Sequence, residues 1–177
     1  MGLIQQASME AQPFYCEENI WNLARTGLHQ GMVVVVSNPS RTVWCRHQRL
    51  GIDVVWDYHV LMVDGQVGSV LDPDSTLPSQ PFGSFWDLTF PKDAPTDLLA
   101  WFRVIESSEF LETLRSDRRH MRAADGTWRH PPPPWPVISP GAWNLDRFWD
   151  MTSSLAPGEV WPRDQVCRRL ELRLAAV

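Results

Sequence analysis

Three side chains that lie far apart in the sequence are of the types that perform nucleophilic catalysis together. Cys16 carries a thiol, His59 an imidazole and Asp72 a carboxylate. A thiolate attacks carbonyl carbons, an imidazole beside it takes up its proton, and a carboxylate can hold that imidazole in one tautomer. The chain therefore contains the parts of a Cys–His–Asp triad, provided that the fold brings the three residues together.

The segment around His59 predicts a β-hairpin. Residues 54–63 predict a strand, Asp64-Gly65 predicts a turn, and residues 67–72 predict the returning strand. A two-residue loop would make Asp72 the diagonal neighbour of His59, and a four-residue loop would place it directly opposite. In both registers the carboxylate lies on the face of the imidazole. The alternative interpretation is a histidine in a local ion pair without a catalytic role.

Cys16 is expected at the start of a helix. Residues 16–26 place apolar side chains at helical spacing, with Glu17 and Glu18 in the first turn. A helix N-terminus lowers the pKa of a thiol and offers backbone N–H groups to a developing oxyanion. The backbone N–H of Cys16 is our first candidate for such a donor. The alternative is that Cys16 is a small buried apolar residue.

The three cysteines argue against a disulfide framework and against a structural metal site. Cys16, Cys45 and Cys167 are widely spaced and form no CxxC pair. Cys45 and His47 share a face of a predicted strand, but two ligands alone make no metal site. We interpret Cys45 and Cys167 as small apolar residues. We expect no metal and no organic cofactor, and free thiols fit the reducing cytoplasm best.

The composition predicts one globular domain and excludes several classes of partner. The chain has 177 residues, of which 44% are hydrophobic, and a formal net charge of −5. No basic stretch resembles a nucleic-acid site or a membrane-surface segment. The longest apolar run, residues 32–36, is too short to span a bilayer. We expect a leader at residues 1–13, a single domain at residues 14–177, and neither nucleic acid nor a membrane as partner.

The order of the predicted elements indicates an α+β fold. Strands are predicted at residues 32–36, 42–46, 54–63, 67–72 and 101–106. Besides the first helix, helices are predicted near residues 108–114, 145–151 and 162–170, and a polyproline II stretch at residues 131–134. A helix followed by an antiparallel sheet and later helices favours packing in layers.

Several segments resemble one known family in the same order along the chain. Tyr15 to Trp21 (YCEENIW) resembles the nucleophile motif of protein N-terminal glutamine amidohydrolases, and Trp56 to Val60 (WDYHV) resembles the histidine motif of that family. Leu71 to Pro78 (LDPDSTLP) is similar to its aspartate segment, although Pro73 departs from the aliphatic residue expected between the two acids. Further matching segments lie at residues 102–105, 116–121 and 126–134, so the resemblance covers about residues 14–170.

The resemblance implies both a fold and a reaction. The fold would be a three-layer α-β-α sandwich around a mainly antiparallel sheet, as in papain-like and transglutaminase-like enzymes. The triad would be Cys16, His59 and Asp72, with Asp74 as the less favoured acid. The enzyme would convert an N-terminal glutamine to glutamate and release ammonia through a Cys16 thioester. The family's place is the N-degron pathway, and we expect a monomer in the cytoplasm or the nucleus that acts on proteins and peptides.

Selection of a chain terminus requires a group that pairs with the α-ammonium of the substrate. Glu17, Glu18 and Asp57 lie beside triad members in the sequence and are the candidates. Each has an alternative role as a solvated acid or as a charge that favours the helix dipole. The sequence does not rank the three.

Two other functions stay open at this point. One is a different thiol enzyme of the same fold, such as a peptidase or a transglutaminase. The other is a non-catalytic interaction module that presents residues 131–136 to an aromatic groove. An intact triad argues against the module, and we interpret the proline stretch as packed scaffold.

Overall fold

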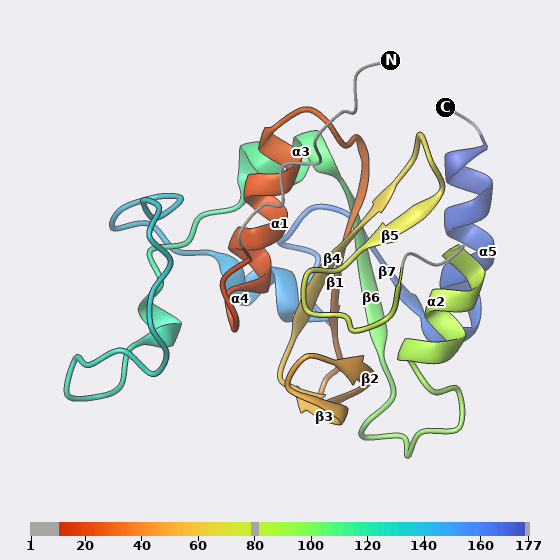
Figure 1. Ribbon diagram of the computed structural model, residues 1–177, viewed down its shortest axis with the longest axis horizontal. Helices are drawn as coiled ribbons and strands as arrows, with labels where there is room; N and C mark the ends of the chain where they lie inside the picture. The colour runs from red at the N-terminus through yellow and green to blue at the C-terminus, as the bar shows by residue number, and fades with distance from the viewer. Residues whose placement is uncertain (1–10, 79–81, 176–177) are drawn as a thin grey trace.

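The computed structural model describes residues 11–78 and 82–175, and it contains two antiparallel sheets (Figure 1). The larger sheet has the strand order β5-β4-β1-β6-β7. Its strands are β1 (Gly31–Ser37), β4 (His59–Asp64), β5 (Ser69–Leu71), β6 (Trp101–Glu106) and β7 (Glu159–Pro162). The smaller sheet pairs β2 (Val43–Gln48) with β3 (Gly51–Trp56).

Helices cover both faces of the larger sheet, so the molecule has three layers (Figure 1). One face carries α1 (Cys16–Arg25), α3 (Ser107–Thr113) and α4 (Leu145–Trp149). The other face carries α2 (Phe82–Thr89) and α5 (Arg163–Leu174). The expectation of an α+β fold with a mainly antiparallel sheet is confirmed.

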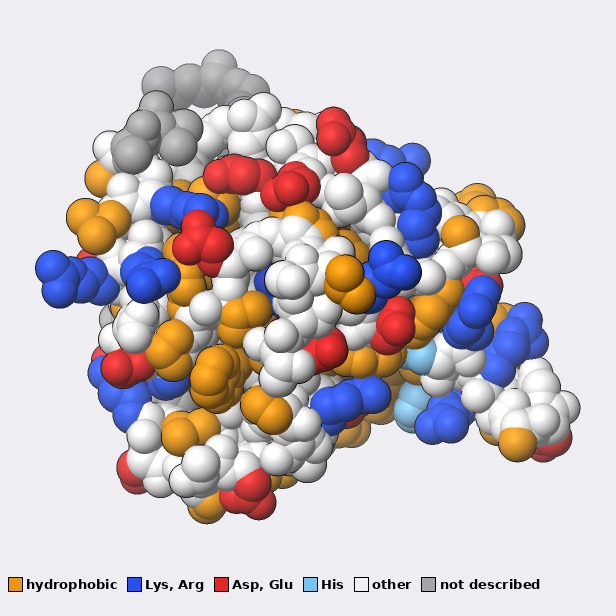
Figure 2. Space-filling view, turned by 180° about the vertical axis from the view of Figure 1, so that it is seen from behind, with side chains coloured by type: hydrophobic (Ala, Val, Ile, Leu, Met, Phe, Trp, Pro, Cys, Tyr) orange, Lys and Arg blue, Asp and Glu red, His pale blue; other side chains and the backbone are white. Residues whose placement is uncertain are grey.

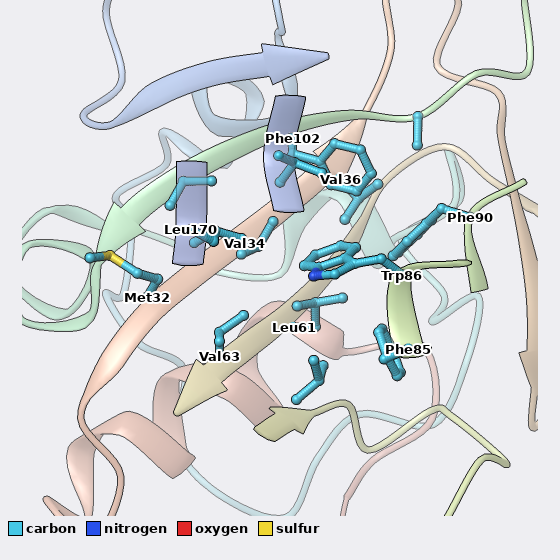
Figure 3. Close-up of a cluster of buried hydrophobic side chains, with 14 of the residues drawn as sticks. Met32, Val34, Val36, Leu61, Val63, Phe85, Trp86, Phe90, Phe102 and Leu170 are labelled. Atoms are coloured by element: carbon cyan, nitrogen blue, oxygen red, sulfur yellow. The ribbon is translucent and has the colours of Figure 1, made fainter. Parts of the chain in front are cut away.

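The alternation of side chains along β1 explains why both faces need helices. Met32, Val34 and Val36 contribute to the core beneath α2 and α5, which Figure 3 shows around Trp86. Val33 and Val35 contribute to the second core, beneath α1, α3 and α4. A central strand that is apolar on both faces is buried on both faces. The run of β-branched residues in β1 therefore predicts its central position in the sheet.

The predicted strand at residues 54–63 is wrong, because the chain forms two strands there that belong to different sheets. The break falls at Asp57 and Tyr58, between β3 and β4. The Asp57 carboxylate accepts a hydrogen bond from the Tyr58 N–H at 3.0 Å, and the Ser37 hydroxyl donates to the Asp57 carbonyl at 2.7 Å. These bonds replace ladder pairing at the break, so the expected shared face of Asp57 and His59 does not hold.

Both predicted registers of the hairpin are also wrong. Val63 pairs with Val70, so the loop is Gly65 to Gly68 and each partner lies further along the chain than expected. The Asp64 carboxylate stabilises this turn by accepting hydrogen bonds from the N–H groups of Gln66 and Val67, at 2.8 and 3.2 Å. The parity of the pairing is nevertheless the expected one, so the chain after β5 still leads Asp72 to the side of His59.

Other elements match their predictions with altered bounds or were not predicted. The strand predicted at 67–72 is β5, which is shorter, and the last helix begins after Pro162 and continues to Leu174. The sequence pattern predicts neither α2 nor β7. Of the expected leader, residues 1–10 lie outside the described part, whereas Gln12 exchanges two 2.9 Å hydrogen bonds with Asn19. Among the described helices, none is long and apolar enough to span a membrane.

An arm formed by residues 115–144 extends from the domain and contains one short 3-10 helix, Arg119–Met121 (Figure 1). Its proline segment packs against the domain through backbone carbonyls. The Pro131 carbonyl accepts a bond from Gln12 at 3.0 Å, and the His130 carbonyl accepts one from Tyr15 at 3.2 Å. These contacts agree with the interpretation of residues 131–134 as packed scaffold.

Candidate active site

Cys16 and His59 line the same cavity, which has a volume of about 660 Å³. Cys16 is the first residue of α1, and His59 is the first residue of β4, against which α1 packs. The arm forms one side of this cavity. Viewed from behind, the arm carries several basic side chains, and histidine side chains lie where it meets the body (Figure 2).

His59 and Asp72 form a buried ion pair at the site. The His59 Nε2 atom lies 3.0 Å from Asp72 Oδ1, and both side chains are almost completely buried. The N–H direction is not aligned as in a good hydrogen bond, and the second Asp72 oxygen has no partner among the described residues. Burial alone would lower the pKa of His59, but the charges of Asp72 and Asp74 outweigh it and raise that pKa. The imidazolium form is therefore stabilised.

The electrostatics around Cys16 differ from the expectation. Burial and then the neighbouring Glu17 raise the pKa of the thiol well above its ordinary value, while the backbone N–H of Val60 acts in the opposite direction. The expectation of a lowered thiol pKa is therefore wrong, because burial and the charge of Glu17 raise this pKa. The thiol must lose its proton during the attack, which makes a base beside it necessary.

The start of α1 leaves a backbone donor free near the thiol. The first helical hydrogen bonds run from the N–H groups of Glu18 and Asn19 to the Tyr15 carbonyl. The N–H of Cys16 donates to no acceptor in the described part of the chain. It is thus available to an oxyanion, as an oxyanion hole requires.

Two of the three candidate acids for the substrate amine have other partners. Glu18 is fully buried and accepts bonds from Arg118 Nε and Nη2, both at 2.7 Å, and from Trp135 Nε1 at 2.8 Å. Asp57 lines the cavity but is 56% exposed and pairs with Arg41 at 2.8 Å. The structure therefore gives Glu18 a structural role and leaves Asp57 as a solvated acid at the cavity rim.

The third acid, Glu17, belongs to a buried cluster behind the cavity wall. The Tyr58 hydroxyl donates to Glu17 Oε2 at 2.9 Å and lies 3.1 Å from His120 Nε2. Glu17 Oε2 also lies 3.9 Å from the Cys16 sulfur. Burial and the charge of Glu18 raise the pKa of Glu17 to about 8, and burial lowers the pKa of His120 to about 4. Near neutral pH the cluster is therefore largely uncharged.

Sequence reasoning missed the aromatic walls of the cavity. Trp56 stacks near His59 with ring centroids 6.2 Å apart, and Phe14 stacks on His130 at 3.6 Å. Three further aromatic side chains line another wall of the cavity: Tyr58, Trp143 and Trp149. Tyr58 and His120 lie in segments that matched the family resemblance, so the motif was available as a signal. Trp143 and Trp149 had no such signal, because many tryptophans serve only packing.

One group of side chains could bind a metal in the described part of the chain. It consists of His59, Asp72 and Asp74, whose ligand atoms lie within 4.8 Å of one another. His59 and Asp72 already form an ion pair with each other, which gives these two side chains a role in the proposed triad. The expectation that the enzyme needs no metal stays a prediction.

Comparison with known proteins agrees with the motifs at this site. Residues 11–170 match the model of a family described as N-terminal glutamine amidase. The chain is 33% identical to the human protein named protein N-terminal glutamine amidohydrolase, over 88% of this chain and 84% of that protein. The bovine protein of the same name is 32% identical over the same shares. The protein of that name from Drosophila melanogaster is 37% identical over 83% of this chain and 81% of its own length.

Proposed function

The chain belongs to the N-terminal glutamine amidase family, and we propose that it hydrolyses the side-chain amide of an N-terminal glutamine in proteins and peptides. The products are an N-terminal glutamate and ammonia. The observation that carries this proposal is the meeting of Cys16 and His59 in one cavity, with Asp72 behind the imidazole. This arrangement supports amide hydrolysis through a thiol nucleophile.

The reaction proceeds in two steps. His59 takes the thiol proton while the Cys16 sulfur bonds to the amide carbon, and the oxyanion is stabilised by the Cys16 N–H. When this intermediate collapses, the carbon–nitrogen bond breaks and His59 gives its proton to the departing ammonia. A thioester to Cys16 remains. Water that loses a proton to His59 then attacks the thioester, and the thiol leaves with that proton.

Asp72 acts on the reaction through His59. Its contact with Nε2 directs that nitrogen away from the thiol and leaves Nδ1 for proton transfer. Its charge stabilises the imidazolium that forms in each step. Asp74 also raises the pKa of His59, but the direct contact is made by Asp72. We therefore keep Asp72 as the third triad member.

The remaining expectations of the sequence analysis are part of the same proposal. The helices on both faces of an antiparallel sheet and a nucleophile at a helix N-terminus agree with a papain-like or transglutaminase-like architecture. We also propose a monomeric enzyme of the cytoplasm or nucleus that acts in the N-degron pathway and uses neither metal nor organic cofactor.

One assay on four peptides tests the proposed reaction. Ammonia release is measured from peptides that begin with glutamine, asparagine or acetylated glutamine, and from a peptide with an internal glutamine. We expect release only from the free N-terminal glutamine, because a side chain one methylene shorter holds its amide carbon away from the thiol. Comparable release from the acetylated or internal peptide would contradict the proposal and favour a general glutaminase or a transglutaminase-like enzyme.

A further inference from the structure

The acids around the cavity differ in whether a cation already neutralises them. Glu18 pairs with Arg118, Asp57 with Arg41, and Asp72 with His59. Glu17 and Asp74 have no Arg or Lys ion-pair partner within the described ranges. Asp74 lies within 4.8 Å of the ligand atoms of His59 and Asp72 and so belongs to that pair, whereas the Oε1 atom of Glu17 has no hydrogen-bond partner in the described part of the chain. Its closest basic neighbour is His120, at 3.4 Å, which is neutral because burial lowers its pKa to about 4. A buried carboxyl group without a counter-charge provides a place for a cation from outside.

The position of Glu17 suits the substrate that the proposed function requires. In glutamine, four bonds separate the α-nitrogen from the side-chain amide carbon, so the two atoms are about 5 Å apart when the side chain is extended. Glu17 Oε2 lies 3.9 Å from the Cys16 sulfur. An attacked carbon lies about 3–3.5 Å from its nucleophile. A glutamine with its amide carbon at the thiol can therefore place its ammonium beside the Glu17 cluster.

The cavity wall in front of Glu17 is suited to an ammonium group. The Tyr58 hydroxyl and the His120 ring line the cavity and separate it from Glu17. The ring centroids of Trp149 and Tyr58 are 4.9 Å apart, and those of Trp143 and His120 are 5.0 Å apart. Both tryptophan rings already attract cations, since the Arg41 guanidinium lies 4.2 Å from the Trp149 ring centroid and that of Arg119 lies 5.9 Å from the Trp143 centroid. An ammonium would share these rings with the two arginines, and the neutral imidazole of His120 can accept a hydrogen bond from it without adding a competing charge.

We propose that the α-ammonium of the substrate binds in a subsite whose buried counter-charge is Glu17 and whose walls are Tyr58, His120, Trp143 and Trp149. The ammonium donates hydrogen bonds at the Tyr58 and His120 surface. Glu17 behind them loses its proton to solvent and becomes the carboxylate that pairs with the cation. The inference rests on the proposed function, since it places the free amine that the reaction requires. Acetylation of that amine removes its positive charge and makes it larger, so the acetylated amine no longer suits the subsite.

The test replaces Glu17 by glutamine, which keeps the size of the side chain and an acceptor for Tyr58 but removes the charge. The preference for a free over an acetylated glutamine peptide, measured as the ratio of kcat/KM values, should fall roughly 100-fold. Glu112→Gln, on the exposed side of α3, is the matched control and should leave that ratio unchanged. Asp57→Asn and Asp74→Asn test the rival acids. If either lowers the ratio more than Glu17→Gln does, the assignment to Glu17 is wrong.

A second measurement does not depend on turnover. A peptide that begins with glutamate, which is the proposed product, should protect Cys16 from alkylation by iodoacetamide, and its acetylated form should not. Glu17→Gln should remove this difference, and Tyr58→Phe should reduce it. If the wild type releases no ammonia, the proposed reaction fails, while the protection data still test the subsite. The subsite proposal is overturned if the wild type is active and Glu17→Gln keeps both the kcat/KM preference for the free amine and the difference in protection of Cys16. Tyr58→Phe supplies the test if Glu17→Gln does not fold.

Discussion

Arg118 holds the carboxylate of Glu18 with two donors, each 2.7 Å from an oxygen, and neither side chain is appreciably exposed. The same guanidinium donates to the Trp135 carbonyl at 2.8 Å, so the pair connects α1 to the C-terminal end of the proline segment of the arm. The arm in turn carries His120 and Trp143 to the cavity. Glu18 thus supports the site, although it lies too deep to contact a substrate.

Glu18→Gln should lower the free energy of unfolding by about 3–5 kcal/mol, because it leaves the buried charge of Arg118 without a counter-charge. Urea unfolding measures the change. Asp117→Asn is the control on the same arm, since Asp117 pairs with the half-exposed Arg119 and should cost less than about 1 kcal/mol. Equal losses for the two variants would show that the Glu18 pair is no more important than a surface ion pair.

Cys16→Ser should fold as the wild type does and lose activity by more than about 100-fold, because a serine hydroxyl is a far weaker nucleophile near neutral pH. Ammonia release from a glutamine-initiated peptide measures it. Cys45→Ser is the comparison, since Cys45 is buried in β2 and does not line the cavity. If Cys16→Ser kept more than about a tenth of the wild-type rate, the nucleophile would have to be another group.

Asp72→Asn should lower kcat roughly 1,000-fold, because an amide neither stabilises the imidazolium nor fixes the tautomer that serves the thiol. Asp74→Asn should lower it less than about 10-fold, since Asp74 influences His59 only through its charge. The pH dependence of kcat for the two variants adds a readout that a loss of folding would not produce. The opposite ranking would identify Asp74 as the triad acid.

The contact between Asp72 and His59 was predictable from the sequence, because it depends on the parity of the hairpin register and not on the exact register. Val63 pairs with Val70, whereas the predicted registers paired it with Gln66 or Gly68, and all three registers keep Asp72 on the side of His59. The position of the loop was not predictable from the Asp64-Gly65 pair, because Asp64 stays in the strand while its side chain caps the N–H groups of Gln66 and Val67. The break at Asp57 was missed for a similar reason, since a side-chain bond replaces the strand pairing there.

The elements and contacts that sequence analysis missed depend on residues far apart in the chain. β7 pairs with β6 across more than fifty residues, and α2 is a short apolar helix without a clear helical period. Glu18 and Glu17 are adjacent and chemically identical, yet one meets Arg118 and the other meets Tyr58 and His120. Only the fold decides which acid has a counter-charge, and for this reason the candidate acids could not be ranked from the sequence.

Arg103 provides a further prediction about the cavity wall. This buried guanidinium donates to backbone carbonyls of residues 148–157, at distances from 2.7 to 3.4 Å, and so holds the segment that carries Trp149. Arg103→Lys should lower the free energy of unfolding by about 2–4 kcal/mol, because an ammonium cannot reach all of these acceptors. Arg169→Lys, in an exposed pair with Glu159, should change it by less than about 1 kcal/mol. A similar change for both variants would contradict this role of Arg103.

The pKa of Glu17 predicts how stability depends on pH. This pKa is about 8 in the folded protein and near 4.5 in an unfolded chain, because burial and the charge of Glu18 disfavour the carboxylate. Between these values the folded state binds more protons than the unfolded state, so the contribution of Glu17 to the free energy of unfolding falls as the pH rises. Glutamine resembles the protonated acid and does not titrate. Relative to the wild type, Glu17→Gln should therefore gain a few kcal/mol of stability between about pH 5 and about pH 9.

Urea unfolding of both proteins across that range measures this difference and separates it from the effect of His120. Burial lowers the pKa of His120 to about 4, so the folded state binds fewer protons than the unfolded state at mildly acidic pH, and the contribution of His120 is lost as the pH falls. Because His120 lies 3.4 Å from Glu17, that loss can differ between the wild type and Glu17→Gln. Above about pH 8 His120 is neutral in the folded and the unfolded state, so the change in the difference from there to about pH 9 reports Glu17 alone. A difference that stays constant from about pH 5 to about pH 9 would mean that Glu17 is already ionised in the folded protein, with a counter-charge close enough to stabilise it.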